Sequence, residues 1–205
     1  MRPSLALKTA CLLAAALFLA PGCSGIKNEF QDRNLYRIGP ISISGQRVVS
    51  GQVPRILVKR FDIAPEFESN AFVFLISQDQ FREDFYNQFM VAPARMITHS
   101  VKEAFLASGL FRPVPAKGFA DAEYRLKGKV TALYGDIRDK NGYSGVMELR
   151  LFLEKQTGHG FDGVINQNYH AQVPLEHPSA KGLSAAWNRC LEQILSDFLM
   201  DFEAL

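Results

Sequence analysis

Residues 147–154 read Met-Glu-Leu-Arg-Leu-Phe-Leu-Glu, and this stretch decides the fold because an apolar residue occupies every second position. That period is typical of a β-strand with one buried face. Residues 125–132 and 165–173 alternate in the same way. Three such strands, each with one apolar and one polar face, favour an antiparallel sheet. The Asn-Gly pair within residues 140–142 lies between residues 125–132 and 147–154, and such a pair is the signal of a tight hairpin.

Two segments show the helical period instead. Residues 93–108 predict a helix, with Pro93 in the first turn and Gly109 as the C-cap. Residues 179–202 predict a longer amphipathic helix that packs on the sheet, although a helix that binds a partner would show the same pattern. Its apolar residues recur at spacings of three and four: Leu183, Trp187, Leu191, Ile194, Phe198 and Phe202.

Shorter strands are expected earlier in the chain, at residues 35–43, 55–63 and 71–77. Residues 80–87 fit either a further strand or an ordered loop. The order of strands, helix, three strands and helix predicts an α+β fold. We therefore expect a single domain over residues 35–205, with a mostly antiparallel sheet and two main helices packed on one face.

The N-terminus has the three parts of a bacterial signal peptide. Arg2 and Lys8 supply positive charge, and residues 10–20 are all apolar. This apolar run is too short to span a bilayer, which takes about 20 residues. Residues 19–23, Leu-Ala-Pro-Gly-Cys, resemble a lipobox, which predicts cleavage after residue 22 and acylation of Cys23. The alternative is an ordinary signal peptide in which the cysteine stands by chance.

The expected mature protein begins with a lipid anchor and a short tether, residues 23–34. About 11 residues extend to roughly 35–40 Å at most, so the domain should stay close to its membrane. Ser24 follows the cysteine where an Asp would resemble the inner-membrane retention signal of enteric bacteria. Its absence favours the periplasmic face of the outer membrane.

Charge and cysteine content narrow the possible functions. The chain has 23 basic and 21 acidic residues, and loss of Arg2 and Lys8 leaves 21 of each. A neutral chain without a basic patch gives no electrostatic basis for binding nucleic acid. Cys11 leaves with the signal peptide and Cys23 would be acylated, so Cys190 has no partner for an internal disulfide.

The chemical motifs in the chain do not predict a catalytic, cofactor or metal site, so we do not expect an enzyme. Residues 158–163 match G-x-G-x-x-G, but strands are expected on both sides, which predicts a hairpin loop. Residues 142–145 lack the second spacing of a nucleophile elbow. The histidines are not spaced as metal ligands. They are His99, His159, His170 and His177.

Residues 81–90 are unusually rich in aromatic side chains. Aromatic residues mark both cores and interfaces. Core filling is one interpretation, and a partner or subunit interface is the other. The candidate interface residues are Phe81, Phe85, Tyr86, Phe89 and Met90.

Several segments together resemble a known family, the ABC-type transport auxiliary lipoproteins. Residues 57–65 (Leu-Val-Lys-Arg-Phe-Asp-Ile-Ala-Pro) resemble its early strand, and residues 72–76 its next strand. Residues 84–89 resemble its aromatic stretch. Residues 93–111, ending Leu-Ala-Ser-Gly-Leu-Phe, resemble its helix and following turn. These motifs reflect side-chain packing and turns, so they identify the fold better than they identify a ligand.

The resemblance implies a non-catalytic outer-membrane lipoprotein. Members serve MCE-type (mammalian-cell-entry-like) ABC transporters, which move lipids or other hydrophobic molecules across the periplasm. The implied partner is an MCE-domain protein, and a closed ring of identical subunits is one arrangement open to such a component. Two alternatives stay open: a structural lipoprotein of the envelope, such as an assembly or pilotin factor, and a periplasmic enzyme, which would need a polar pocket that the sequence does not indicate.

The lipobox resemblance predicts that Cys23 is the first residue of the mature protein and carries acyl chains. Intact-mass analysis and palmitate labelling of the membrane fraction test this. Cys23→Ser should abolish labelling. A soluble, unlabelled mature protein would exclude the anchor, and so would labelling that survives the substitution.

Overall fold

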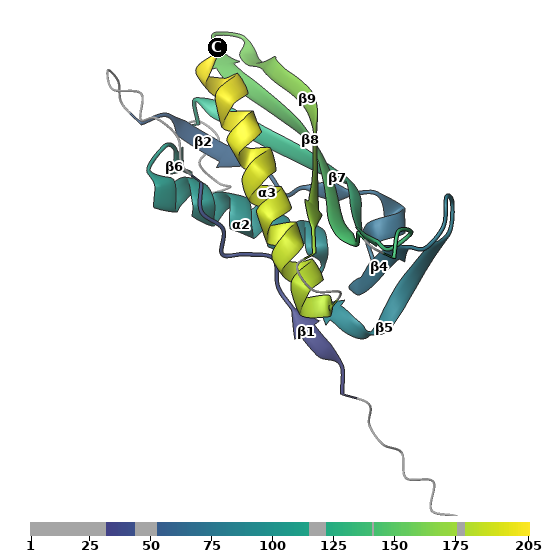
Figure 1. Cartoon of the computed structure of the whole chain (residues 1–205). Helices are drawn as coiled ribbons and strands as arrows, with labels where there is room; N and C mark the ends of the chain where they lie inside the picture. The colour runs from purple at the N-terminus through teal and green to yellow at the C-terminus, as the bar shows by residue number, and fades with distance from the viewer. Residues whose placement is uncertain (1–31, 44–52, 115–121, 141, 176–178) are drawn as a thin grey trace, which may run out of the picture. The chain divides into compact units, whose positions relative to one another are not determined.

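The computed structural model describes residues 32–43, 53–114, 122–140, 142–175 and 179–205. Within them, nine strands form one sheet, and two long helices, α2 and α3, pack with it (Figure 1). Cys23 and the predicted signal peptide lie outside the described residues.

The three strands predicted from alternating residues form the largest part of the sheet. They are β7 (Tyr124–Asp136), β8 (Ser144–Thr157) and β9 (Gly160–Pro174). β8 pairs antiparallel with both neighbours. Leu126 of β7 lies opposite Leu153 of β8, and both are fully buried. The period-2 pattern therefore identified the buried face correctly as far as Val130 of β7, after which a register shift buries Leu133 in place of Ala132. The G-x-G-x-x-G stretch lies at the turn between β8 and β9, as predicted.

The remaining strands are short and make the sheet mixed. β2 (Arg55–Val58), β3 (Asp62–Ile63) and β4 (Ala71–Leu75) all pair parallel with β7. β5 (Phe81–Phe89) pairs antiparallel with β4. The two edge pairings, of β1 (Asn34–Tyr36) with β5 and of β6 (Arg112–Pro113) with β2, are parallel. The long pairings are thus antiparallel and most short ones are parallel.

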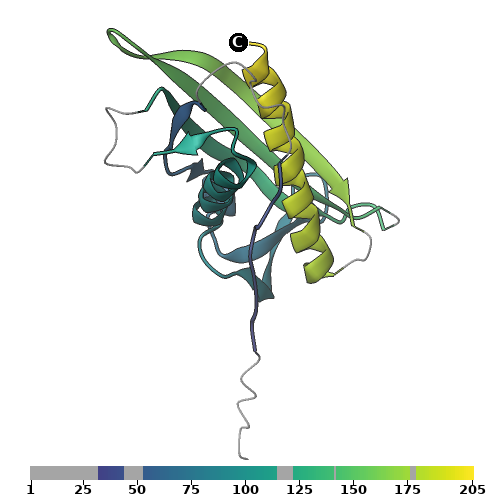
Figure 2. The ribbon, with the colours of Figure 1, turned by 90° about the vertical axis from the view of Figure 1, so that its left-hand side faces the viewer.

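The strand predicted at residues 35–43 is wrong beyond Tyr36, because the chain leaves the sheet and runs between the two helices (Figure 2). The Ser100 hydroxyl of α2 donates to the carbonyl of Ile38 at 2.8 Å. The amide of Gly39 donates to Asn188 Oδ1 of α3, also at 2.8 Å. Gly39 has a φ of +98°, and a Cβ there would lie 2.4 Å from Ser100 Oγ. This crossing therefore requires glycine.

The strand predicted at residues 55–63 is interrupted, because one of its side chains packs in the core. It divides into β2 and β3, because Phe61 is buried between them. The Phe61 amide donates to Thr98 Oγ1 of α2 at 3.0 Å instead of to a neighbouring strand. A hydrogen bond to a helix thus replaces one hydrogen bond between strands at this residue.

Both predicted helices are present and share one core with the sheet. α2 (Pro93–Ser108) starts at Pro93 and ends at Gly109, whose φ is +67°. α3 (Ala180–Glu203) is capped by Ser179, whose hydroxyl accepts the Gly182 amide at 3.0 Å. The rings of Phe105 in α2 and Phe198 in α3 stack at 6.3 Å. The fold is α+β, as predicted.

The sheet-facing side of α3 should dominate stability. Leu191 is fully buried, so Leu191→Ala should lower the free energy of unfolding by about 2–5 kcal/mol through lost contacts and a cavity. Leu106→Ala, at a leucine that is 62% exposed, is the matched control and should stay within about 0.5 kcal/mol of the parent. Chemical denaturation measures both. Equal midpoints for the two variants would contradict the assignment of this face to the core.

Candidate functional site: the aromatic bulge of β5

β5 carries a bulge in the middle of its pairing with β4. Phe72 of β4 lies opposite Asp84, but the preceding residue, Ala71, lies opposite Gln88. The register therefore skips residues 85–87 of β5. Extra residues in one strand bend it and change the direction of its side chains. The bulge thus accounts for the way the aromatic stretch divides between core and surface.

The bulge is held by a network of hydrogen bonds centred on Asp84. The Asp84 carboxylate accepts the amides of Tyr86 at 2.8 Å and Asn87 at 3.1 Å, and the side-chain amide of Asn87 at 2.7 Å. Asn34 of β1 in turn donates from Nδ2 to Asn87 Oδ1 at 3.2 Å. One acidic side chain thus satisfies backbone donors that have left the ladder. The bulge has a defined conformation and is tied to the first strand.

Two aromatic side chains project from this bulge into solvent. Phe85 is 58% exposed and Tyr86 is 44% exposed. Their rings meet edge to face, with centroids 5.3 Å apart. The guanidinium of Arg33 lies 4.7 Å from the centre of the Phe85 ring, at the distance of a cation–π contact.

Beside the bulge lies an apolar cavity of about 410 Å³, named the β5 groove here. Its walls come from β4 and the residue that follows it, from β5, and from the residue that follows β7. A neighbouring cavity of about 250 Å³ shares Phe74, Asp84 and Ile137 with it, and extends toward the start of α3. The residues lining the β5 groove are Phe74, Ile76, Arg82, Glu83, Asp84, Phe85, Tyr86 and Ile137.

The five residues predicted as an interface have different environments. Phe89 is buried, with its ring 4.7 Å from Phe72 and 5.2 Å from Trp187, so core filling is the correct interpretation there. Phe81 is 46% exposed, and its ring also packs edge-on against Tyr134 at 5.5 Å. Phe85, Tyr86 and Met90 are exposed, as an interface requires.

Sequence reasoning missed the opposite wall of the groove. Phe74, Ile76 and Ile137 come from segments that meet β5 only through sheet pairing. No local pattern marks them as neighbours of the bulge. A prediction of the parallel pairing of β4 with β7 would have been needed to find them.

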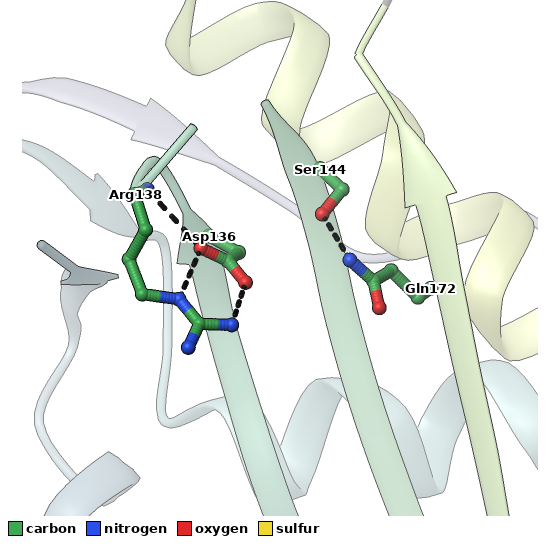
Figure 3. Close-up of polar contacts among 4 residues, drawn as sticks. All are labelled: Asp136, Arg138, Ser144 and Gln172. Atoms are coloured by element: carbon green, nitrogen blue, oxygen red, sulfur yellow. Dashed lines mark hydrogen bonds and ion pairs between the residues drawn. The ribbon is translucent and has the colours of Figure 1, made fainter. Parts of the chain in front are cut away.

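A polar cluster lies close to the groove, where β7 ends and β8 begins (Figure 3). Arg138 donates to the carboxylate of Asp136 from Nε at 3.0 Å and from Nη2 at 2.6 Å. This hydrogen bonding lowers the pKa of Asp136, so the carboxyl stays ionised near neutral pH. The Ser144 hydroxyl accepts Gln172 Nε2 at 2.8 Å. An amide cannot take up the serine proton, so this contact does not activate Ser144 as a nucleophile.

The described residues contain neither a group of acidic, histidine and cysteine side chains suited to a metal nor a buried side-chain polar atom without a hydrogen-bond partner. Among the same residues, neither long helix is apolar enough over a sufficient length to cross a bilayer. The residues lining the groove offer apolar contact together with the charged side chains of Arg82, Glu83 and Asp84.

No known family model matches the sequence, and no curated protein is significantly similar to it. The fold, however, is shared with solved structures. Protein XCC0632 from Xanthomonas campestris, which carries the family designation DUF330, superposes with a TM-score of 0.70 at 15% identity. The match covers 83% of this chain and 98% of that protein.

Two further structures show the same fold. An uncharacterized protein superposes with a TM-score of 0.64 at 11% identity, over 83% of this chain and 99% of its own. The hypothetical protein CT253 from Chlamydia trachomatis superposes with a TM-score of 0.55 at 7% identity, over 75% of this chain and 100% of its own. At such identities the similarity establishes the fold alone.

The Asp84 network predicts a local response to mutation. Asp84→Ala removes the acceptor for two backbone amides, so the amides of Tyr86 and Asn87 should exchange with solvent faster. Hydrogen exchange followed by NMR measures this. Glu83→Ala, which removes a carboxylate from the adjacent position, is the control and should leave both amides protected. Unchanged exchange in Asp84→Ala would show that the bulge does not depend on this carboxylate.

Proposed function

We propose that this protein is a non-catalytic lipoprotein subunit of an MCE-type ABC transport system, anchored at the outer membrane through Cys23. Its role is to hold the periplasmic MCE assembly in place while lipids or other hydrophobic molecules cross the periplasm. The single observation that carries the proposal is the ordered aromatic bulge beside an apolar groove. We propose the β5 groove as the site where apolar side chains of the MCE-domain protein dock.

The distribution of exposed apolar residues supports a docking role. Of the ten large hydrophobic side chains exposed in the described part of the chain, three lie close together on β5: Phe81, Phe85 and Tyr86. Exposed apolar side chains gathered in one region mark interaction sites far more often than scattered ones do. The bulge combines Phe85, Tyr86 and a stacked arginine, residue types that are enriched at protein interfaces.

The family resemblance supports the choice of partner. Residues 57–65 supply the second half of β2 and all of β3, residues 72–76 supply most of β4, and residues 84–89 contain the bulge. Residues 93–111 supply α2 and the turn after it. The segments that resemble the auxiliary lipoproteins thus include one wall of the groove and the elements that support it.

The polar contacts near the groove support a role without catalysis. Asp136 is held as a carboxylate by Arg138, and Ser144 is bonded to an amide. Neither arrangement provides a proton acceptor beside a nucleophile, which hydrolytic chemistry requires. The charged side chains that do line the groove, Arg82, Glu83 and Asp84, instead suit the orientation of a protein partner.

The docking site can be tested by photo-crosslinking in native membranes. A photo-reactive phenylalanine analogue at position 86 of the full acylated chain should crosslink to an MCE-domain protein. Phe85→Ala should reduce pull-down of that partner, because truncation of an aromatic anchor typically costs more than 1 kcal/mol of binding. Leu106→Ala, at an exposed leucine on α2, is the control and should leave recovery unchanged.

Two results would overturn the proposal. One is recovery of no MCE or ABC component under conditions that preserve such complexes. The other is a crosslink to a secretion or assembly factor, which would favour the pilotin-type alternative.

A further inference from the structure

A second exposed surface lies where the chain enters the domain, outside the lining of the β5 groove. Tyr36 of β1 lies in register with Phe89 of β5, and both rings approach Phe72 in the core, at 5.1 Å and 4.7 Å. Successive side chains of a strand point to opposite faces. Leu35 and Met90 therefore face outward, and each is 57% exposed.

The two outward residues are neighbours across the strand pair. The amide of Met90 donates to the carbonyl of Tyr36 at 2.8 Å, so the pairing of β1 and β5 extends to this residue. Leu35 and Met90 are then diagonal neighbours on one face, within reach of long side chains. Val91 follows and is 38% exposed. The face formed by Leu35 and Met90, with the exposed Val91 next to it in sequence, is named the tether face here.

The charges around the tether face are mostly positive. The segments that carry it, residues 32–38 and 88–96, contain three exposed arginines and one acidic residue. An apolar face bordered by positive charge complements an anionic lipid surface. The charged residues are Arg33, Arg37, Arg95 and Asp32.

The length of chain between the expected anchor and the domain limits where this face can be. Asp32 is nine residues after Cys23, and nine residues reach about 30 Å at most. The first described strand, β1, follows at once and carries Leu35 itself. With Cys23 anchored, contact between this face and the bilayer would be intramolecular. A small apolar surface is then enough to hold the domain against the lipid.

We propose that the tether face rests on the lipid surface to which Cys23 is anchored, and so orients the domain with its β1 end toward the membrane. This inference rests on the proposed acyl anchor but not on the identity of the protein partner. The C-terminal end of α3 lies at the far end of the domain from β1 (Figures 1 and 2) and would face away from the bilayer.

Spin labels at two exposed methionines test the orientation. Met90→Cys places a nitroxide on the tether face, and Met200→Cys places one at the last turns of α3, where the native side chain is 59% exposed. The native Cys190 will not compete for the label, because it is buried and burial raises the pKa of its thiol to about 12.

The measurement uses the full acylated chain in vesicles of phosphatidylethanolamine and phosphatidylglycerol, with no partner present. The ratio of collisions with oxygen to collisions with a soluble nickel chelate should rise several-fold at position 90 on vesicle binding. It should stay at its aqueous value at position 200. The same label on a Cys23→Ser chain in solution gives the aqueous baseline.

The outcomes separate the two proposals. A chain that fails to float with vesicles lacks the anchor, which overturns the proposed lipoprotein and this inference with it. A chain that floats while position 90 stays as aqueous as position 200 overturns only the inference. Dipolar broadening between labels at position 90 would assign the tether face to contact with a second copy instead, and would also overturn it.

Discussion

The structure depends on the burial of Trp187 from α3 against the sheet. Its ring is fully buried, 4.8 Å from Phe72 of β4 and 5.2 Å from Phe89 of β5, and its indole N–H donates to the carbonyl of Tyr134 in β7 at 3.2 Å. One side chain thus joins the last helix to three strands. A Cβ on Gly145 would lie 2.9 Å from Ala186 Cβ, so the helix sits close enough to the sheet for this contact only because β8 has glycine there.

This constraint decides which aromatic residues remain available for function. Because Phe89 is drawn into the cluster with Trp187, the direction of β5 is fixed at its end. Asp84 fixes the strand on the other side of the bulge. The chain between these two points is longer than the pairing with β4 requires, so residues 85–87 project outward. The exposed aromatic rings are therefore a consequence of how the core is built, and their exposure is stable.

Much of the fold could be predicted because its largest elements have local periodicity. β7, β8 and both helices bury one face over most of their length, and β9 does so at Tyr169 and Ala171, so period 2 and the helical period were sufficient. The strand predicted at residues 35–43 was wrong beyond Tyr36, because the chain turns at Gly39 and forms hydrogen bonds with Ser100 and Asn188, which are remote in sequence. The groove could not be predicted for the same reason: the approach of Ile137 to Phe85 depends on the register of β4 with two other strands.

The rigidity of the bulge also bears on why a binding role fits this domain. Ordering a flexible loop on binding costs free energy for each side chain that is immobilised. Here the Asp84 carboxylate and the Asn34–Asn87 hydrogen bond have already fixed the backbone, and Arg33 already stacks on Phe85. A partner would therefore meet an aromatic surface whose conformation is set during folding. The same network ties the bulge to β1 through the Asn34–Asn87 hydrogen bond, so the proposed docking surface and the first strand are held together.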